Sequence, residues 1–428
     1  MDAKTAQEGR RVVVIGAGIV GVSCALALLQ DGWRVTLLEP GEPGGEQAAS
    51  HGNGAWLSPA SVVPMSMPGL WKKVPGYLLD RDGPLVIRWR ALPRLAPWLL
   101  AFLRAGATVP RVQATARALA ALLHDAPQRH EQLAARAGVA HLVQRRGLLY
   151  AYPDRAAFNA EALAWRLRRD NGVCWDEWDA ATLRQRVPAL AARYHFGAWV
   201  GAGGHCLDPG AYVAALAAQA LREGAQWQRG RAVGFEFSGN RLAVVRLEGT
   251  GSLACDLAVV AAGMASRPLA WAAGDRVLLE SERGYHVELP QAPLELPMPV
   301  MPSDGKMANV SLAGRFRISG QVELASVQAP PDWRRAEVLL QHARRSYDAL
   351  VGLPADAPRR RWMGHRPSTP DGRPVIGPAR RSPQVLHAFG HGHIGLAAGP
   401  ITGQWIADLA AGRAPACDLA PYSPRRFG

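Results

Sequence analysis

Cysteine is scarce in this sequence, and no two cysteines stand at short spacing. The five cysteines of the 428 residues are odd in number and lie far apart, so no Cys-x-x-Cys motif is present to hold zinc or an iron–sulfur cluster, or to form a redox disulfide. This pattern excludes a disulfide-stapled protein. It predicts reduced thiols in a cytoplasmic protein without a metal site.

A long hydrophobic run is also absent. Residues 12–29 are uncharged, but they fall short of the roughly 20 apolar residues that a helix needs to cross a bilayer. Three glycines at fixed spacing interrupt them, and no small-residue cleavage site follows. We therefore expect neither a targeting signal nor a transmembrane helix.

Acidic residues are outnumbered by basic ones. The chain has 49 Lys and Arg against 35 Asp and Glu, a net charge of +14. Half of this excess lies in residues 71–130, which hold ten basic and three acidic side chains and also three tryptophans. Residues 71–104 are therefore a candidate for peripheral contact with the inner face of a membrane. The alternative is a helix packed on the core with a solvated basic face.

The start of the chain carries a glycine-rich turn between a strand and a helix. Arg11–Ile15 reads as a buried strand, and it is followed by Gly16, Gly18 and Gly21 and by a helix that ends near residue 30. The first glycine forms the turn, the second admits a pyrophosphate and the third lets the helix pack closely. Glu39 ends the next strand, where a carboxylate can bind ribose hydroxyls. Together these features predict a dinucleotide-binding fold.

A second strand indicates which dinucleotide is bound. Residues 256–264 form an apolar run that ends in a turn at Gly263. This run resembles the second nucleotide-contacting strand of two-dinucleotide-binding flavoproteins, and the opening of the chain resembles their FAD motif. We therefore expect FAD.

Four further motifs carry a resemblance to a known family. They are Ser50-His-Gly-Asn-Gly-Ala-Trp-Leu-Ser-Pro59, Arg283-Gly-Tyr-His286, the segment from Trp362 to Gly377 that contains Gly-His-Arg-Pro-Ser-Thr-Pro-Asp-Gly, and Phe389-Gly-His-Gly-His-Ile-Gly395. In this order they resemble the D-amino-acid oxidase superfamily, and most closely its bacterial branch of D-amino-acid dehydrogenases, D-hydroxyproline dehydrogenases and glycine oxidases. The resemblance covers nearly the whole chain.

The expected architecture is α/β, with a Rossmann-like FAD-binding domain of the two-dinucleotide-binding type and an α+β substrate domain with a mixed sheet. We assign residues 9–58, 205–278 and 362–428 to the FAD-binding domain, and residues 59–204 and 279–361 to the substrate domain. Expected elements are helices near 111–137, 155–170, 209–224, 334–351 and 400–411, strands at 147–152 and 285–289, and an antiparallel pair at 231–236 and 242–247.

The resemblance also implies roles for individual residues. Arg366 is expected to bind the substrate carboxylate, since a guanidinium matches a carboxylate through two parallel hydrogen bonds; a structural arginine is the alternative. Tyr285 is favoured over His286 as the residue of its strand that faces the substrate, and His393 is assigned to the substrate side. The expected FAD contacts are Gly16, Gly18, Ile19, Val20, Gly21, Glu39, Pro40, Ser50, Asn53, Gly54, Val233, Gly263, Gly364, His391, Gly392, His393, Ile394, Gly395 and Leu396.

The family attaches flavin covalently in some members through a cysteine upstream of Thr-Pro-Asp. This sequence has Gly364, His365 and Arg366 there, so we expect non-covalent FAD.

The implied reaction is dehydrogenation of a small amino acid, a D-amino acid or a cyclic D-imino acid such as D-hydroxyproline, by hydride transfer from the α-carbon to flavin N5. The electron acceptor, quinone or oxygen, stays open. The alternatives are a glycine or sarcosine oxidase, a tRNA-binding flavoprotein and a non-catalytic flavoprotein subunit; no nucleic-acid motif is present, and we expect no nucleic-acid partner.

Overall fold

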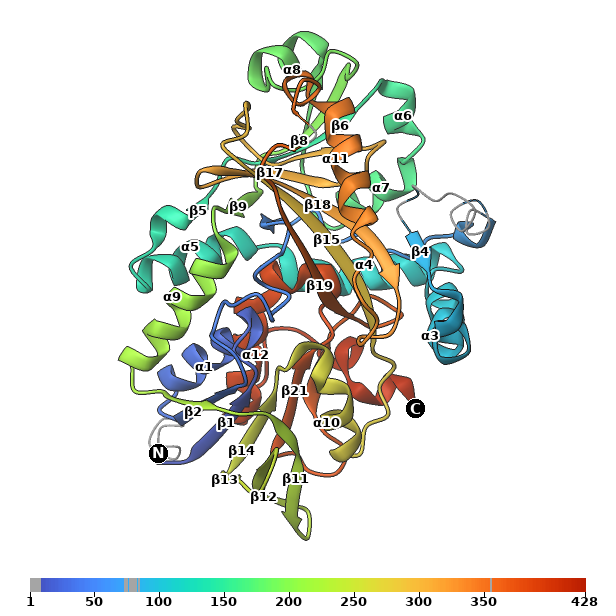
Figure 1. Cartoon of the computed structure of the whole chain (residues 1–428). Helices are drawn as coiled ribbons and strands as arrows, with labels where there is room; N and C mark the ends of the chain where they lie inside the picture. The colour runs from blue at the N-terminus through green and yellow to red at the C-terminus, as the bar shows by residue number, and fades with distance from the viewer. Residues whose placement is uncertain (1–8, 73–75, 77–82, 84, 355) are drawn as a thin grey trace.

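Two sheets organise the molecule, one in the lower and one in the upper half of Figure 1. The computed structural model describes residues 9–72, 76, 83, 85–354 and 356–428. The expected α/β class is confirmed, and the second sheet is mixed, as expected.

The lower sheet has six strands and is built mainly from parallel pairs. Its order is β10-β2-β1-β14-β21-β20, and only the β20–β21 pair is antiparallel. The strands are β1 (Arg11–Ile15), β2 (Arg34–Glu39), β10 (Gln226–Arg229), β14 (Leu257–Val260), β20 (Val375–Pro378) and β21 (Val385–Phe389). Segments far apart in the sequence thus lie side by side in one sheet.

A separate hydrophobic core packs on each face of the lower sheet. Val12 and Val14 of β1 pack into a core with α1 (Ile19–Gln30), α9 (Pro209–Arg222) and α12 (Gly395–Ala410). Val13 and Ile15 pack into a second core with α10 (Ser266–Ala272) and the small sheet of β11 (Ala232–Ser238), β12 (Arg241–Leu247) and β13 (Ser252–Ala254). This arrangement is the alternation that a strand buried on both faces produces.

The upper sheet is mixed, and β15 and β19 extend from it toward the lower sheet (Figure 1). Its order is β19-β15-β18-β17-β16-β6-β8-β7, and β4 also pairs with β18. The strands are β4 (Leu85–Ile87), β6 (Leu148–Tyr152), β7 (Asp176–Asp179), β8 (Phe196–Val200), β15 (Glu280–Pro290), β16 (Val300–Pro302), β17 (Ala308–Leu312), β18 (Arg315–Leu324) and β19 (Arg360–Ser368). Apolar residues of α11 (Arg334–Ser346) join its core.

The remaining helices and strands lie outside the two large sheets. They are α3 (Leu92–Ala105), α4 (Val109–Leu123), α5 (Ala126–Arg136), α6 (Arg155–Asn159), α7 (Ala162–Asp170) and α8 (Ala180–Arg186), and a small sheet of β3 (Trp56–Leu57), β9 (Gly204–Cys206) and β5 (Val143–Gln144). Among the described residues, no helix is long and apolar enough to cross a membrane.

The expected domain boundaries agree only in part with the arrangement of the two sheets, and the division of the chain into two domains stays a prediction. Every strand of the lower sheet falls within the three segments assigned to FAD binding. The boundary at residue 362, however, falls inside β19, which pairs with β15 in the upper sheet. Helices α4 and α5, expected in the substrate domain, supply Leu119, Leu122 and Ala134 to the core of the lower sheet. Periodicity shows which face of a helix is apolar but not which sheet that face covers.

Many expected elements are confirmed, but three helices are interrupted or shorter than expected. The expected helix at 111–137 is two helices, because Asp125 leaves the helical conformation and Pro127 starts the second. The expected helix at 155–170 breaks after Asn159, and the one at 334–351 ends at Ser346, before a 3₁₀ turn. The hairpin of β11 and β12 and the helix after Asp208, whose carboxylate caps Ala211 N, are as expected.

Helix α12 begins five residues earlier than expected because its proline is accommodated inside it. Pro400 lies in the interior of the helix and cannot donate a hydrogen bond to the carbonyl of Leu396. The side chain of His130 on α5 forms this hydrogen bond instead, and its Nε2 lies 2.8 Å from Leu396 O. A residue distant in sequence thus satisfies the backbone group that the proline leaves open.

Candidate active site

One cavity of about 600 Å³ lies between the two sheets. It extends from Gly16 and Glu39, at the carboxyl ends of β1 and β2, to Tyr285 on β15 and Arg366 on β19. The carboxyl edge of a parallel sheet is where nucleotides bind in open α/β folds. The cavity therefore joins a nucleotide site to a second site on the upper sheet.

The three glycines of the opening turn do what their positions predicted. Gly16 has φ +107°, and a Cβ there would lie 2.5 Å from the carbonyl oxygen of Ala261. A Cβ on Gly21 would lie 1.8 Å from the carbonyl oxygen of Gly16, so the close packing of α1 requires glycine. At Gly18 the nearest atom would be Ser50 Oγ, at 3.4 Å, which leaves the backbone open to a ligand.

Glu39 is buried at the end of β2 and lines the cavity. Its Oε2 accepts from Ala17 N at 2.8 Å and its Oε1 from Gly41 N at 3.3 Å. These amides hold the carboxylate at the edge of the sheet. A carboxylate there can accept hydrogen bonds from the ribose of a bound nucleotide.

Most of the residues that we predicted as FAD contacts line this cavity. Gly21 does not, because its role is the packing of α1. Val233 is also outside the lining and is 45% exposed, whereas its neighbour Ala232 lines the cavity. Successive residues of a strand point in opposite directions, so the side chains of Ala232 and Val233 lie on opposite sides of the strand. The contact of Val233 with FAD stays a prediction. The remaining predicted contacts, from Gly16 to Leu396, are all in the wall.

The middle of the cavity has small side chains on one side and the start of α12 on the other. A Cβ on Gly54 would lie 3.3 Å from Ala308 Cβ and 3.7 Å from Ser319 Cβ, so a larger residue would fill this space. Residues 390–397, which lead into α12, form the opposite wall. The partial positive charge of a helix N-terminus favours negative charge on a group bound there.

His391 and His393 both belong to this wall, but their environments differ. Thr402 donates its hydroxyl proton to Ala398 O at 2.8 Å, so at 3.0 Å it accepts from His391 Nε2. His391 is thus fixed by α12, and burial lowers its pKa to about 3. His393 is exposed along the cavity wall, where desolvation and the charge of Arg366 lower its pKa to about 4. Both rings are therefore neutral near pH 7.

Arg366 lies at the far end of the cavity and is held by backbone carbonyls. Its Nη1 donates to Gln321 O at 2.9 Å, and its Nη2 lies 3.5 Å from Gly320 O. A Cβ on Gly284 would lie 2.3 Å from the Arg366 Cζ, so the guanidinium rests on the bare backbone of β15. The guanidinium has five N–H donors, and these two contacts leave others free to bind a carboxylate from the cavity.

A β-bulge sets the position of those carbonyls. Arg283 pairs with Glu323 and Tyr285 pairs with Gly320, so β18 has one residue more than β15 over this step. Gln321, within the bulge, has φ +59°, an uncommon conformation for a residue other than glycine. Bulges often re-aim groups next to active sites, and this one directs the carbonyl of Gln321 at Arg366.

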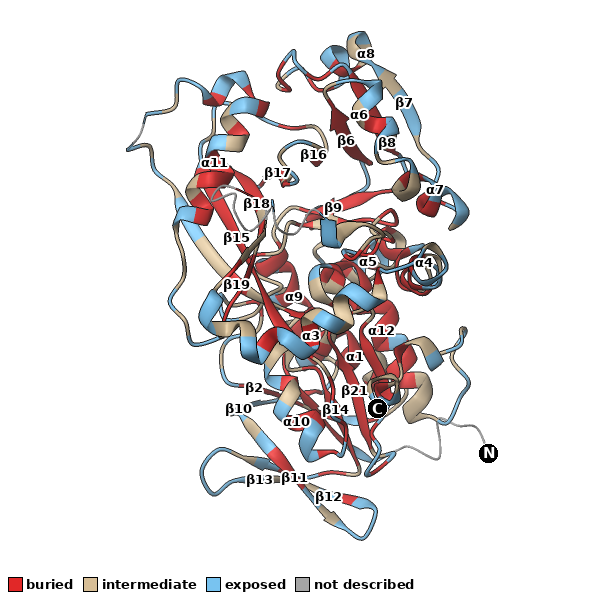
Figure 2. Cartoon of the chain, turned by 90° about the vertical axis from the view of Figure 1, so that its right-hand side faces the viewer, coloured by how far each residue is buried: buried red, intermediate tan, exposed pale blue. Residues whose placement is uncertain are grey.

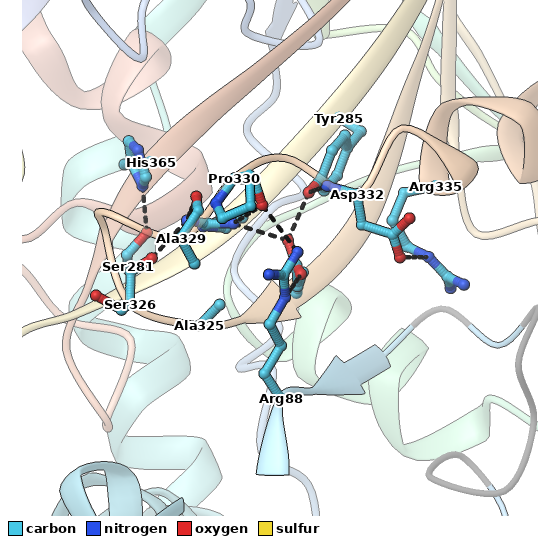
Figure 3. A network of polar contacts seen from close by, with 12 residues as sticks. Arg88, Ser281, Tyr285, Ala325, Ser326, Ala329, Pro330, Asp332, Arg335 and His365 are labelled. Carbon is cyan, nitrogen blue, oxygen red and sulfur yellow. Dashed lines mark hydrogen bonds and ion pairs between the residues drawn. The ribbon is translucent and has the colours of Figure 1, made fainter. Parts of the chain in front are cut away.

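Tyr285 lines the cavity, but its hydroxyl is engaged inside the protein (Figure 3). The hydroxyl donates to Glu323 Oε2 at 2.5 Å and accepts from Asp332 N at 3.0 Å. Burial and then Glu323 raise the pKa of the phenol above its usual range. The side chain of Tyr285 is 1% exposed and packs against Trp333 in the core of the upper sheet, and its proton is committed to Glu323. The expectation that Tyr285 faces the substrate stays a prediction. His286, on the same strand, instead stacks on Trp362 and does not line the cavity.

Glu323 is buried and is the centre of a polar network. Figure 3 shows members of this network, among them Arg88, Tyr285 and Pro330. Besides Tyr285, Glu323 binds Arg88 at 2.5 Å and Arg283 at 3.3 Å. Arg283 also donates to the carbonyls of Ser326, Ala329 and Pro330. The network thus fixes the segment between β18 and α11 to the strand that carries Tyr285.

Several cavity residues were missed by the sequence prediction. They are His365, whose Nδ1 lies 2.8 Å from Ser281 Oγ, Trp362, whose Nε1 donates to Glu46 O, and Lys306 and Gln321, which both have positive φ. His365 and Trp362 stand beside the predicted Arg366 in sequence, and this proximity was the available signal. Lys306 and Gln321 reach the cavity through strand pairing, which no local motif encodes.

These features fit FAD. The glycine turn leaves the backbone open at Gly18, Glu39 stands at the ribose position, and small residues face the start of α12. When FAD is bound, Gly16 to Val20 and Glu39 would hold its nucleotide part, and residues 390–397 would adjoin its ring system. The fold and the cavity together define a flavin-dependent oxidoreductase.

Comparisons with known proteins agree with this class. The family model for FAD-dependent oxidoreductases (DAO) matches residues 11–409. D-amino-acid oxidase from Bradyrhizobium diazoefficiens is 50% identical over 423 residues, covering 98% of this chain and 99% of that protein. D-amino acid dehydrogenase 2 from Ralstonia nicotianae is 34% identical over 442 residues, covering 97% and 100%. Glycine oxidase from Geobacillus kaustophilus has the same fold, with a TM-score of 0.73 at 21% identity over 97% of this chain and 98% of that one.

The chain belongs to the DAO family of FAD-dependent oxidoreductases. The family resemblance, the fold and the FAD cofactor expected from the sequence are thereby confirmed.

Proposed function

We propose that this enzyme dehydrogenates D-amino acids at the α-carbon, with cyclic D-imino acids such as D-hydroxyproline within its range. The observation that carries the proposal is Arg366, a guanidinium aimed into the cavity and held there by the carbonyls of Gln321 and Gly320. A carboxylate is the natural partner of such a fork. The relatives named D-amino-acid oxidase and D-amino acid dehydrogenase support the D configuration.

The protein's contribution to this reaction is binding and orientation. FAD, when bound, supplies the two-electron acceptor that takes the α-hydrogen as hydride at flavin N5. Arg366 fixes the substrate carboxylate and so aims the α-carbon. Tyr285 belongs to the wall, and neutral His393 adds no positive charge that would repel the substrate amine. With these groups, orientation rather than an acid–base pair carries the catalysis.

Anaerobic bleaching of the flavin tests the proposal. The yellow holoenzyme is mixed without oxygen with D- and L-amino acids, glycine, sarcosine and the hydroxyproline epimers. We expect rapid loss of flavin absorbance with D-amino acids only. Bleaching by glycine or sarcosine alone would instead favour that oxidase class, and no bleaching by any of them would reject amino-acid oxidation. Acid precipitation should release all of the FAD, because we propose that the cofactor is bound non-covalently.

The electron acceptor can be read in the same experiment. After bleaching, air is admitted, and in a second cuvette a soluble quinone is added without oxygen. Fast reoxidation by the quinone and slow reoxidation by air would identify a dehydrogenase, and the reverse would identify an oxidase.

We further propose that α3 and the turn before it contact an anionic membrane surface. Figure 2 shows exposed residues along this helix; Trp89 is 66% and Leu100 is 67% exposed, and Arg90 and Arg104 lie among them. Apolar and basic side chains on one helix face suit the interface of an anionic bilayer. The part of residues 71–104 that lies at 73–75, 77–82 and 84 is outside the described residues.

Sedimentation with vesicles tests this contact. We expect the protein to pellet with vesicles rich in anionic lipid at low salt and less at high salt. The double variant W89S/L100S should lose this binding. The control variant W271S changes a tryptophan on α10 that is 52% exposed, and it should still pellet. No pelleting of the native enzyme at low salt would reject the contact.

A further inference from the structure

We propose that the substrate part of the cavity is built for amino acids with a second anionic group, and that Lys306 binds this group. D-Aspartate and D-glutamate have the required chemistry. The inference rests on the proposed function, because it takes Arg366 as the site of the α-carboxylate.

The charges along the cavity are strongly unequal. Arg231, Lys306 and Arg366 are the cationic side chains of its wall, and Glu39 is the acidic one, among the residues that the structure describes. Arg231 and Glu39 lie at the nucleotide end, where Gly230 N donates to Glu39 O. The upper-sheet part therefore has two cations and no carboxylate in its wall.

Lys306 and Arg366 meet at one residue of β18. Arg366 Nη2 lies 3.5 Å from the carbonyl oxygen of Gly320. A Cβ on Gly320 would lie 3.5 Å from the carbonyl oxygen of Lys306. The guanidinium of Arg366 and the backbone of Lys306 thus both lie close to Gly320. Gly54 and Ala308 keep the neighbouring wall free of large side chains. Two cationic residues near one point of the wall suit a short substrate that carries two anionic groups.

The carboxylates nearest to this region are occupied elsewhere. Glu323 binds Arg88, Arg283 and Tyr285. Asp304, two residues before Lys306, binds Arg193 at 2.7 Å and Tyr194 at 2.8 Å. Since these groups are engaged, they leave the charge of Lys306 available to a ligand.

Glu282 is the one carboxyl that faces Arg366 from the neighbouring strand. It lies outside the lining of this cavity, and Ser368 Oγ donates to it at 2.8 Å. Burial raises the pKa of Glu282, while Ser368 and the charge of Arg366 act in the opposite direction. Glu282 is therefore a partner of Arg366 outside the cavity wall and does not approach a ligand through that wall.

The backbone of Lys306 is held in an uncommon conformation. Its φ is +46°, and its amide donates to Pro302 O at 3.0 Å in the turn between β16 and β17. Glycine would adopt this conformation without strain, and strain of this kind gathers at ligand sites. The chain has only four lysines, and one of them is at this strained position.

Matched substrate pairs test the proposal, because each pair differs in one charge. The rates of anaerobic flavin reduction are measured with D-glutamate against D-glutamine and with D-aspartate against D-asparagine. We expect kcat/KM to be higher for the acid of each pair in the native enzyme. K306M should reduce the acid-to-amide ratio about 10-fold or more, since a hydrogen bond to a charged group is lost, and K306R should retain most of it.

K72M is the matched control, because it removes one lysine charge from an exposed position outside the cavity. We expect its acid-to-amide ratios to equal those of the native enzyme. Equal rates for acid and amide in the native enzyme would overturn the proposal, and so would a K306M ratio like that of the control. A K306M enzyme that changed only in its reoxidation by oxygen would overturn it as well. Bleaching by D-amino acids would still stand in each case.

A binding experiment separates this inference from the proposed reaction. Glutarate and its monoamide are titrated into the oxidised holoenzyme, and the flavin spectrum reports binding without turnover. We expect glutarate to bind more tightly, and K306M but not K72M to remove the difference. Equal binding of the two compounds would reject the second anion site even if no amino acid were oxidised.

Discussion

Two arginines on neighbouring strands differ in their burial and in their hydrogen-bond partners. Arg283 on β15 is fully buried and binds Glu323 and three backbone carbonyls. Arg366 on β19 is half-buried, donates hydrogen bonds to the backbone carbonyls of Gln321 and Gly320, and opens into the cavity. The strands are paired, with His365 opposite Arg283 and Arg366 opposite Glu282.

The difference shows how one protein uses the same side chain for structure and for binding. A buried arginine whose Nη atoms bind one carboxylate and three carbonyls fixes the chain but has little left to give a ligand. A guanidinium held by neutral carbonyls keeps its orientation and its charge. Access to the cavity and the absence of a hydrogen-bonded carboxylate partner therefore distinguish Arg366 from Arg283 among the residues that the structure describes.

Replacing Arg366 should give the largest effect on activity. R366M removes two charge-assisted hydrogen bonds, each worth about 1.5–3 kcal/mol, so kcat/KM for the best D-amino acid should fall about a thousandfold. R366K should fall less, since it keeps the charge but loses the fork. Stopped-flow flavin reduction measures both. FAD content and melting temperature should stay near native values, and their collapse would show that Arg366 is structural.

Replacing Arg283 should instead give the largest effect on stability. R283M leaves Glu323 with one cation fewer and three carbonyls without their donor, so the free energy of unfolding should fall by about 3–5 kcal/mol. Urea denaturation of the holoenzyme measures the change. R166M, at an exposed arginine on α7, is the control and should be close to native. A stable R283M enzyme with impaired substrate binding would reverse the comparison.

Tyr285 connects the two regions, because it belongs to the cavity wall and its hydroxyl binds the network. Y285F keeps the ring and leaves Glu323 and Asp332 N without that partner, which should cost about 1–3 kcal/mol of stability. Flavin reduction should change by less than about 10-fold, since 1.4 kcal/mol corresponds to one factor of ten. A large loss of rate at native stability would make the hydroxyl catalytic.

The smallest expected effect is a change in the pKa of His393, which lines the same cavity as Arg366. Desolvation and, to a smaller extent, the charge of Arg366 together lower the pKa of His393 to about 4. In R366M the pKa should therefore rise toward its ordinary value near 6.5, but only in part, because burial is the larger cause. NMR titration of the ring measures it. R283M should leave this pKa unchanged, and an equal rise in both variants would contradict the assignment.

The nucleotide end of the site could be predicted because its signals are local. Gly16, Gly18 and Gly21 have fixed roles in one turn, and Glu39 ends the next strand of the same unit. A short stretch of sequence thus contains the strand, the turn, the helix and the acid, and each constrains the others.

For the substrate end the sequence offered only Arg366, Tyr285 and His393, through family resemblance, and their substrate roles stay predictions. Lys306, Gln321 and Glu323 owe their positions to the pairing of β15, β17 and β18 and to the bulge in β18. Register shifts between strands distant in sequence leave no periodic signal. The same holds for His130, which supplies the hydrogen bond that Pro400 cannot make.

The interleaving of strands in the lower sheet has a consequence for biosynthesis. Strand β1 begins at residue 11, but β14, its neighbour, begins at residue 257, and β21 begins only at residue 385. At about 5–20 residues per second, a ribosome needs roughly 20–75 s to make β21 after β1. Over that time the pair of β1 and β2 and its glycine turn lack part of the sheet and the cavity wall at residues 388–397. Loading of FAD is therefore a late event, after nearly the whole chain has been made.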